Sequence, residues 1–424
     1  MKSRRAAFAF VFLTATLDMV ALGIIVPVLP KLVVTFMGGN AAHAAEIFGV
    51  FGTIFALMQF VFAPVLGMLS DRFGRRPVIV LSNFGMGLDY LIMALAPNVG
   101  WLFVGRTLSG ITAASFSTAM AYVADVTPHE KRAGAFGMLS AAFGIGFILG
   151  PALGGVLGNV DPRLPFWVAA GLSVANAVYG LIVLPESLPP EKRPTALVWR
   201  RANPLGSLKL LRSHSEIFGL AAVNFFVYVA HEVLPNVYVL YVIYRFAWDE
   251  RTIGVSLALV GAMSMLVSAW LVRAAVERLG ERRVLFAGLL AGVAAFALFG
   301  AAGNGALFLA AIPLIALWGL AGPPAQSIMS RRVSASEQGE LQGALSSMRG
   351  ISMLIGPGLF TLTFATFIDK QRAVQLPGAP WFLAALLMIV SIALAWGVTR
   401  VRTDSDSAEV DAPREEANPS VAAH

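Results

Sequence analysis

The stretch GMLSDRFGRR, residues 67–76, lies between two long apolar runs and decides how the chain is organised. It contains one acid, three arginines and two glycines: Asp71, Arg72, Arg75, Arg76, Gly67 and Gly74. Glycine has no Cβ and therefore permits close packing and tight turns. Arginines collect in any short cytoplasmic loop, but the fixed order of acid, glycine and arginine is more specific. We predict a short, charged loop between two buried helices.

The composition is that of a membrane protein. Of the 424 residues, 57% are hydrophobic and 13% are charged, whereas soluble domains carry about 25% charged residues. A helix needs about 20 apolar residues to cross the hydrocarbon, so the chain has room for about twelve. There is no cysteine, which excludes disulfides and thiol chemistry. The net charge of +7 lies in loops, where contact with a cytoplasmic leaflet accounts for it, and we expect no nucleic-acid partner.

Apolar runs bounded by charge, proline or asparagine predict the membrane-spanning helices. They lie at 7–30, 46–69, 78–96, 99–122, 134–158, 164–184, 214–241, 250–272, 284–303, 305–329, 341–366 and 379–399. We therefore predict an all-α membrane protein with twelve transmembrane helices in two pseudo-symmetric six-helix bundles. The bundles are residues 1–184 and 214–400, joined by a polar, proline-broken linker at 185–213. The acidic tail, 401–424, is predicted to be disordered.

Lysine and arginine gather on one side of the predicted membrane. That side has the N-terminus, the charged loop, the central linker and the end of the last span. The other side has only Lys31, Arg163, Arg245, Arg251, Lys370 and Arg372. The positive-inside rule therefore predicts a multi-pass membrane protein with cytoplasmic N- and C-termini.

An internal repeat supports the division into two halves. DRFGRR at 71–76 reappears in degenerate form as ERLGER at 277–282, each directly after an even-numbered span. The pair Gly-Pro also recurs, at 150–151 in the fifth span and at 356–357 in the eleventh. Two similar halves suit a transporter that rocks around a site near the middle of the membrane.

Charged residues inside the spans are the candidates for proton coupling. Asp18 lies midway in the first span, where a carboxylate costs about 2.5–3.5 kcal/mol; a structural acid that packs helices is the alternative. Asp89 and Arg106 flank the turn at 97–100, at nearly equal depth, about 12 Å in by helix rise. A carboxylate that responds to the movement of an arginine can couple protons, and a static ion pair is the alternative. Arginine releases no proton, so the proton rides on Asp18, Asp89 or Glu46.

The fifth span contains GIGFILGPALGG, residues 144–155. Its glycines recur every four residues, which forms a small-residue face for close helix contact, and its proline provides a bend. The order G-x-x-x-G-P-x-x-G-G comprises Gly146, Gly150, Pro151, Gly154 and Gly155. Packing alone accounts for the spacing of the glycines, whereas the full order is much rarer.

Other polar residues in the spans are candidates for lining a substrate cavity: Gln59, Asn83, His231, Glu232, Asn236 and Gln326, with Asn176, Gln342 and Arg349 beside them. Amides also hold helices together. His231 and its neighbours share the seventh span with Tyr228, Tyr238 and Tyr241, a cluster that forms either a binding wall or an interfacial aromatic belt. HEVLP lacks a second histidine, so we predict no metal site.

Three stretches together resemble the drug:proton antiporters of the major facilitator superfamily: GMLSDRFGRR, GRTLSG at 105–110 and GFILGPALGG at 146–155. LDMVALGIIVPVLP, GLDYLIMALAP and RFAWDERTIGVSL at 245–257 are similar to the tetracycline efflux pumps. The likeness covers nearly the whole chain apart from the central linker and the tail.

The resemblance implies export of tetracycline, chelated to a divalent cation such as Mg²⁺, in exchange for a proton. The cation would travel with the substrate, and no resident cofactor is expected. Asp18 and Asp89 match the family's intramembrane acids, which couple protons and engage the drug–metal complex. Asp71 and Arg75 match its gating loop, and Arg106 matches its fourth-helix arginine.

One departure from the family concerns the eighth span. The family often has a histidine there, followed four residues later by a glutamine, where this chain has Ser264 and Ser268. The departure bears on the identity of the drug more than on antiport. The alternatives are a multidrug exporter of other amphiphiles, a proton-coupled uptake carrier for a metabolite, and a membrane sensor. We see no nucleophile–base set or phosphate loop, so no enzyme is expected. We expect a monomer whose partners are a small-molecule drug, protons and the lipid bilayer.

Overall fold

The computed structural model describes residues 2–113, 115–128, 131–194, 208–209, 215–334, 337–372 and 374–410. Within these ranges the long elements are all helices, because lipid offers the backbone no hydrogen-bond partners and a helix satisfies them internally. The first half comprises α1 (Lys2–Ile25), α2 (Leu29–Phe36), α3 (Ala41–Phe73), α4 (Arg75–Leu95), α5 (Val99–Thr112), α6 (Ser115–Val126), α7 (Arg132–Val160) and α8 (Leu164–Val183).

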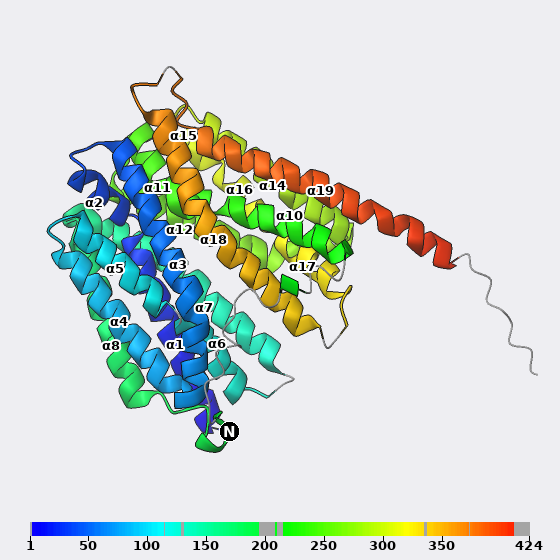
Figure 1. Ribbon diagram of the computed structural model, residues 1–424, viewed down its shortest axis with the longest axis horizontal. Coiled ribbons are helices and arrows are strands. Elements are labelled where there is room, and N and C mark those ends of the chain that lie inside the picture. The colour runs from blue at the N-terminus through cyan, green and yellow to red at the C-terminus, as the bar shows by residue number, and fades with distance from the viewer. Residues whose placement is uncertain are drawn as a thin grey trace, which may run out of the picture.

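The second half follows a linker whose described part includes one short 3₁₀ turn, η2 (Pro190–Lys192). Its elements are α10 (Ser215–His231), α11 (Val233–Phe246), α12 (Glu250–Leu266), the π-helical turn η5 (Val267–Leu271), α13 (Val272–Leu279), α14 (Glu281–Ala301), α15 (Gly305–Ala310), α16 (Ile312–Trp318), α17 (Gly322–Ser330), α18 (Gln338–Ile368) and α19 (Ala379–Val410). Figure 1 shows the two halves as separate bundles that meet along α3, α7, α12 and α18.

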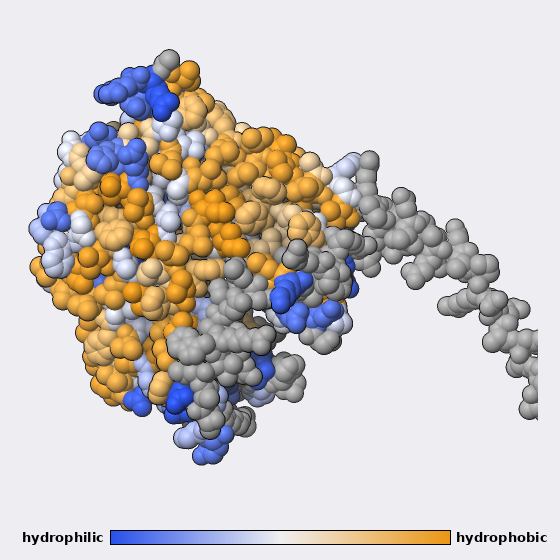
Figure 2. Space-filling model, viewed as in Figure 1, coloured by the Kyte–Doolittle hydropathy of each residue, from blue (hydrophilic) through white to orange (hydrophobic). Residues whose placement is uncertain are grey.

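Eleven segments within the described ranges are long and apolar enough to cross a membrane. They correspond to the predicted spans other than 99–122. That span is occupied by α5 and α6, which flank position 114 outside the described residues. Figure 2 shows an apolar surface between two hydrophilic ends. The chain is a multi-pass membrane protein, and the predicted all-α fold with twelve helices is confirmed.

Prolines and short polar side chains set the helix boundaries. The first span breaks at Pro27, so that α1 ends at Ile25 and α2 begins at Leu29, because proline cannot donate to the preceding turn. Four helices begin at a side chain that accepts a hydrogen bond from a backbone N–H three residues later. These residues are Asn40, Asn98, Asp249 and Asn304.

The two halves pack against each other through equivalent helices. The fifth span, α7, lies along the eighth, α12, and the second span, α3, lies along the eleventh, α18. The Gly-Pro pairs at 150–151 and 356–357 lie inside α7 and α18, so the repeated pair occurs at both of these contacts.

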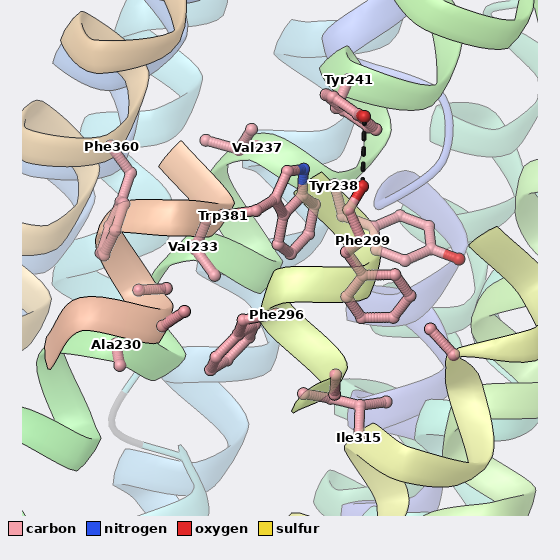
Figure 3. Close-up of a cluster of buried hydrophobic side chains, with 14 of the residues drawn as sticks. Ala230, Val233, Val237, Tyr238, Tyr241, Phe296, Phe299, Ile315, Phe360 and Trp381 are labelled. Atoms are coloured by element: carbon pink, nitrogen blue, oxygen red, sulfur yellow. Dashed lines mark hydrogen bonds between the residues drawn. The ribbon is translucent and has the colours of Figure 1, made fainter. Parts of the chain in front are cut away.

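The second half is built around an aromatic cluster, which we define as Tyr238, Tyr241, Phe299, Phe308 and Trp381. All five side chains are buried. The ring centroid of Phe299 lies 4.4 Å from that of Phe308 and 5.1 Å from that of Trp381. The Tyr241 hydroxyl donates to the Phe299 carbonyl at 3.1 Å (Figure 3). The prediction that Tyr238 and Tyr241 belong to a binding wall or an interfacial belt is therefore wrong, because both lie in the packed core of the bundle.

The last helix runs further than predicted. Helix α19 continues to Val410, ten residues past the expected end of the second bundle, since the first proline after the span is Pro413. Residues 401–410, predicted to be disordered, are therefore helical. The rest of the predicted tail, 411–424, and most of the linker after position 194 lie outside the described residues.

Candidate functional site

A buried polar cluster joins α1, α4 and α8 in the first half. Asp18 of α1 is 3% exposed, and it accepts a hydrogen bond from Asn176 Nδ2 of α8 at 2.6 Å. With its amide nitrogen turned toward the acid, Asn83 of α4 donates to both Asp18 oxygens, at 3.0 and 3.1 Å, and accepts from Asn176 at 3.1 Å. Asn176 also donates to the Thr14 carbonyl at 3.0 Å. The two amides therefore fix the Asp18 carboxylate inside the bundle.

A second buried acid, Asp89, lies on α4 beyond Asn83. Asp89 is completely buried, and its Oδ2 accepts a hydrogen bond from Ser109 of α5, whereas its Oδ1 has no partner. Arg106 lies on α5 as predicted, but its guanidinium lies over the ring of Phe55, 4.3 Å from the centroid. Both charged residues are described, and they form no ion pair, although their charges interact. The structure therefore contains no static ion pair between Asp89 of α4 and Arg106 of α5.

The glycine motif of the fifth span packs α7 onto the helix that carries Asp18. A Cβ built on Gly150 would lie 2.6 Å from Gly23 Cα of α1, and one built on Gly154 would overlap the Ile24 carbonyl. Gly146 contacts Met19, the residue after Asp18. Backbones can approach this closely only where side chains are absent, so Gly146, Gly150 and Gly154 determine where Asp18 sits relative to α7.

Gly155, the last residue of the motif, instead faces the second half. A Cβ built on it would lie 2.9 Å from Gly254 Cα of α12. On the other contact between the halves, a Cβ built on Gly52 of α3 would lie 2.7 Å from Pro357 of α18. Lys31, at the same end of the molecule, forms an ion pair of 2.6 Å with Glu250. The halves are therefore closed together at the end opposite the linker.

At the linker end, which we call the basic end, glycines on the same helix faces have no neighbour among the described residues. On α7, Gly144 contacts Met265 of the second half. Gly137 lies seven residues earlier and therefore shares that helix face. Yet no heavy atom outside its own helix lies within 4 Å of a Cβ built on Gly137, and the same holds for Gly67 of α3 and Gly339 of α18. The two halves therefore part toward the basic end.

The predicted gating loop is a single residue. Gly67 to Phe73 form the last turns of α3, and α4 begins at Arg75, so only Gly74 is not helical. Its φ of +107° lies in a region that glycine adopts readily. A Cβ there would overlap the carboxylate of Glu186. The chain thus reverses in one residue, which corrects the prediction of a longer loop.

Arg75 holds this turn through acids from two helices and the linker. Its guanidinium pairs with Asp71 at 2.5 Å and with Asp125 of α6 at 3.1 Å. Its backbone N–H donates to Glu186 Oε1 at 2.9 Å, which places a carboxylate at the N-terminus of α4, where the helix dipole favours it. In this structure Asp71 contacts its own half. Sequence analysis missed Asp125 and Glu186, although both are acids at the end of an even-numbered span.

The neighbouring arginines differ in their contacts. Arg76 donates to the carbonyls of Leu181 and Gly180, so it joins α4 to the end of α8. Arg72 lies 5.7 Å from the ring centroid of Phe73. The matching turn of the second half keeps a positive φ, +80° at Gly280, and there Glu281 accepts from Ser327 at 2.8 Å.

The remaining cavity candidates divide into two groups. Glu232 and Asn236 are buried at the junction of α10 and α11, where Asn236 Nδ2 donates to the Glu232 carbonyl at 2.8 Å. His231 is exposed, and Gln326 donates to Gln342 at 3.2 Å across α17 and α18. Gln59 is partly buried on α3, whereas Glu46, the other proton candidate, is exposed near the start of that helix. Within the described residues no cluster of acids and histidines suits a metal ion.

Comparison with known proteins agrees with this architecture. The family model of the Major Facilitator Superfamily matches residues 11–357 and 220–423. The chain is 36% identical to the class C tetracycline resistance protein of Escherichia coli over 392 residues, 92% of this chain and 96% of that protein. It is 37% identical to the class D protein of Salmonella ordonez over 382 residues, 89% and 93% of the two chains.

Solved structures show the same fold at low identity. A bacterial homologue of the lysosomal transporter Spinster, inward-facing and occupied, aligns with a TM-score of 0.74 at 16% identity, over 93% of this chain and 96% of that one. The nucleoside transporter NupG aligns with a TM-score of 0.71 at 13% identity, over 93% and 98% of the chains. This chain belongs to the Major Facilitator Superfamily, in the family of the tetracycline resistance proteins.

Proposed function

We propose that this transporter is a proton-coupled drug efflux antiporter, with a tetracycline chelated to a divalent cation such as Mg²⁺ as its first substrate. The observation that carries the proposal is the pair of buried acids, Asp18 and Asp89, in a chain that closely resembles tetracycline resistance proteins over most of its length. A membrane protein keeps buried acids at such depth mainly for function, because they are costly.

The two acids have different surroundings, which suggests different roles. Asp18 is surrounded by amide donors, which stabilise a carboxylate. Asp89 has a single hydroxyl donor and one oxygen without a partner, and a buried carboxyl with so few donors binds a proton readily. We assign the transported proton to Asp89 first. Arg106, held over Phe55, is near enough to compete with that proton when the helices shift.

The arrangement of the two halves supports alternating access. They are closed at one end by Gly155, Gly254 and the Lys31–Glu250 pair, and they part at the basic end. Rocking about α3, α7, α12 and α18 would expose the acids to each side in turn. We place the termini and the basic end in the cytoplasm by the positive-inside rule, in the bacterial inner membrane, with a monomer as the working unit. Mg²⁺ would enter with the drug, and the protein needs no cofactor.

The proposal is tested in inverted membrane vesicles energised with a proton gradient. We expect tetracycline uptake that requires Mg²⁺, collapses with an uncoupler, and falls by about 100-fold or more in Asp89→Asn, since no other carboxyl replaces the proton site. Membrane insertion of the variant is checked by immunoblot. Full uptake by both Asp18→Asn and Asp89→Asn would overturn the mechanism. Drug-dependent proton release with another amphiphile, but not with tetracycline, would keep the antiporter and change its substrate.

A further inference from the structure

Helix α18 carries an arginine near the middle of its span. Arg349 lies eleven residues after the first residue of α18, and its side chain is exposed. An arginine at this depth is costly when it faces lipid. The helix face on which Arg349 lies therefore shows whether its side chain faces lipid or the space between the two halves.

The neighbours of Arg349 on α18 face inward. Arg349 and Gly356 are seven residues apart and share one helix face, and a Cβ built on Gly356 would overlap Glu232, the residue that follows α10. The adjacent face contacts the first half, because a Cβ built on Gly350 would lie 2.7 Å from Phe60 of α3. Arg349 therefore projects between α10 and the first half, away from lipid.

The charge of Arg349 is not neutralised by an ion pair. The positive charge of Arg349 acts on Glu232, the acid that directly follows α10, and on His231. However, Glu232 accepts from Asn236 at 3.3 Å, and among the described residues Arg349 forms no salt bridge. The planar fork of an arginine matches two oxygens of an anionic group. This guanidinium is therefore available to a ligand.

An aromatic platform lies beside the arginine. The ring centroids of His231 and Trp318 are 5.6 Å apart, with 38° between their planes. Trp318 continues into the packed core through Phe296, 5.3 Å away, so its ring is held rigidly. His231 is exposed, and it offers a flat face on which another ring can stack.

We infer that Arg349, His231 and Trp318 form a binding site in the second half for the anionic edge of a planar, conjugated substrate. The arginine contacts an ionised enol or carboxylate oxygen, His231 contacts the flat ring system, and the buried Trp318 supports the His231 ring from behind. The site rests on the proposed efflux function and adds the chemical class of its substrate. In this arrangement the second half binds the substrate, and the buried acids of the first half bind the proton.

The site is tested by direct binding, which needs no transport. The probes are two xanthene dyes with the same flat ring system, anionic fluorescein and cationic rhodamine 123, and the measurement is equilibrium dialysis of the purified full-length protein. We expect Arg349→Gln to weaken fluorescein binding by about 10–100-fold, the value of one charge-assisted contact, and to leave rhodamine 123 unchanged. Trp318→Leu should weaken both dyes.

Two further variants separate binding from folding. Arg349→Lys keeps the charge but loses the fork, so we expect fluorescein to bind about 3–10-fold more weakly. Arg273→Gln removes an exposed arginine of α13 that pairs with Glu277, and it should change neither dye. Equal weakening of both dyes in Arg349→Gln, or an unchanged affinity for fluorescein, would overturn the site. Failure of tetracycline uptake with fluorescein binding intact would reject only the proposed drug.

Discussion

The two halves of the molecule share a topology but differ in what their interiors contain. The first half buries a network of acids and amides around Asp18 and Asp89. The second half buries the aromatic cluster, in which rings from α11, α14, α15 and α19 pack edge to face or stacked. Buried polar networks require every partner in place, whereas aromatic packing tolerates polar change but not loss of volume.

This difference indicates that each half specialises. The first half contains the buried acids, and its basic end is held by the contacts of Arg75 with Asp71, Asp125 and Glu186. The second half offers a stable scaffold for the exposed face of Arg349. Variants of the two interiors should therefore fail in different ways. Variants of the second half should lower the stability of the protein, and variants of the first half should weaken the coupling of transport to protons.

The largest effect is expected in the aromatic cluster. Trp381→Ala removes a fully buried ring and should lower the free energy of unfolding by about 3–5 kcal/mol, measured by denaturation of the purified protein in detergent. Trp381→Phe is the control, since the indole N–H has no partner in the structure, and it should cost about 1 kcal/mol. A stable Trp381→Ala protein that fails to couple protons would contradict the division between the halves.

The reverse outcome is expected in the polar cluster. Asn176→Leu removes the donor to Asp18 and to the Thr14 carbonyl, so proton-driven uptake should fall by about 10–100-fold with little change in thermal stability. Asn224→Leu is the matched control and should transport normally, because this buried amide of α10 donates to the Leu220 carbonyl of its own helix and to the Met329 sulfur, and contacts no acid. If both variants behave alike, buried amides serve only to pack the helices.

The glycine contact between α1 and α7 gives an intermediate effect. Gly154→Ala places a methyl group on the Ile24 carbonyl, and overpacking of this kind costs about 1–3 kcal/mol. Gly134→Ala, on the same helix but in open space, should stabilise the protein by up to about 1 kcal/mol through helix propensity. Thermal denaturation of both variants in detergent distinguishes the two. Similar melting temperatures would show that α1 adjusts to the added methyl group.

The smallest effect is expected where the halves meet. Lys31→Gln leaves the Glu250 carboxylate, 4% exposed, without its partner at 2.6 Å, and should favour opening of that end by about 1 kcal/mol. Because the chain has no cysteine, spin labels at Gly38→Cys and Arg251→Cys report the separation of the halves by pulsed electron resonance. The exchanged pair, Lys31→Glu with Glu250→Lys, should restore the closed distances. Unchanged distances in Lys31→Gln would show that the pair does not hold this end shut.

The fold could be predicted from the sequence because a membrane leaves few options. Each long apolar run must be a helix, and the repeat of DRFGRR as ERLGER gave the two halves. The lengths of connections were harder to predict. The predicted gating loop consists of Gly74 alone. Because this glycine takes a positive φ, the residues on both sides of it can keep helical φ and ψ.

The candidate site could be predicted only in part. Charges within apolar runs stand out, so Asp18, Asp89 and Arg106 were identified directly. Asp125 and Glu186 were missed, because their importance comes from contact with Arg75 across helices, which no local pattern records. Tyr238 was misread for a related reason: composition shows that a span contains tyrosines but not which of its faces the bundle buries.

The two matching turns show how the copies of a repeated turn can differ. Gly74 and Gly280 keep the same backbone reversal, at φ +107° and +80°, but only at Gly74 does an acid, Glu186, occupy the space that a Cβ needs. In a deep mutational scan, Gly74 should therefore tolerate no side chain. Nothing among the described residues lies within 4 Å of a Cβ at Gly280, but its ψ of 156° combines with the positive φ in a region that essentially only glycine adopts. Gly280 should therefore also resist substitution, with a smaller loss of function, because its backbone alone restricts it to glycine whereas Gly74 is restricted by its backbone and its neighbours.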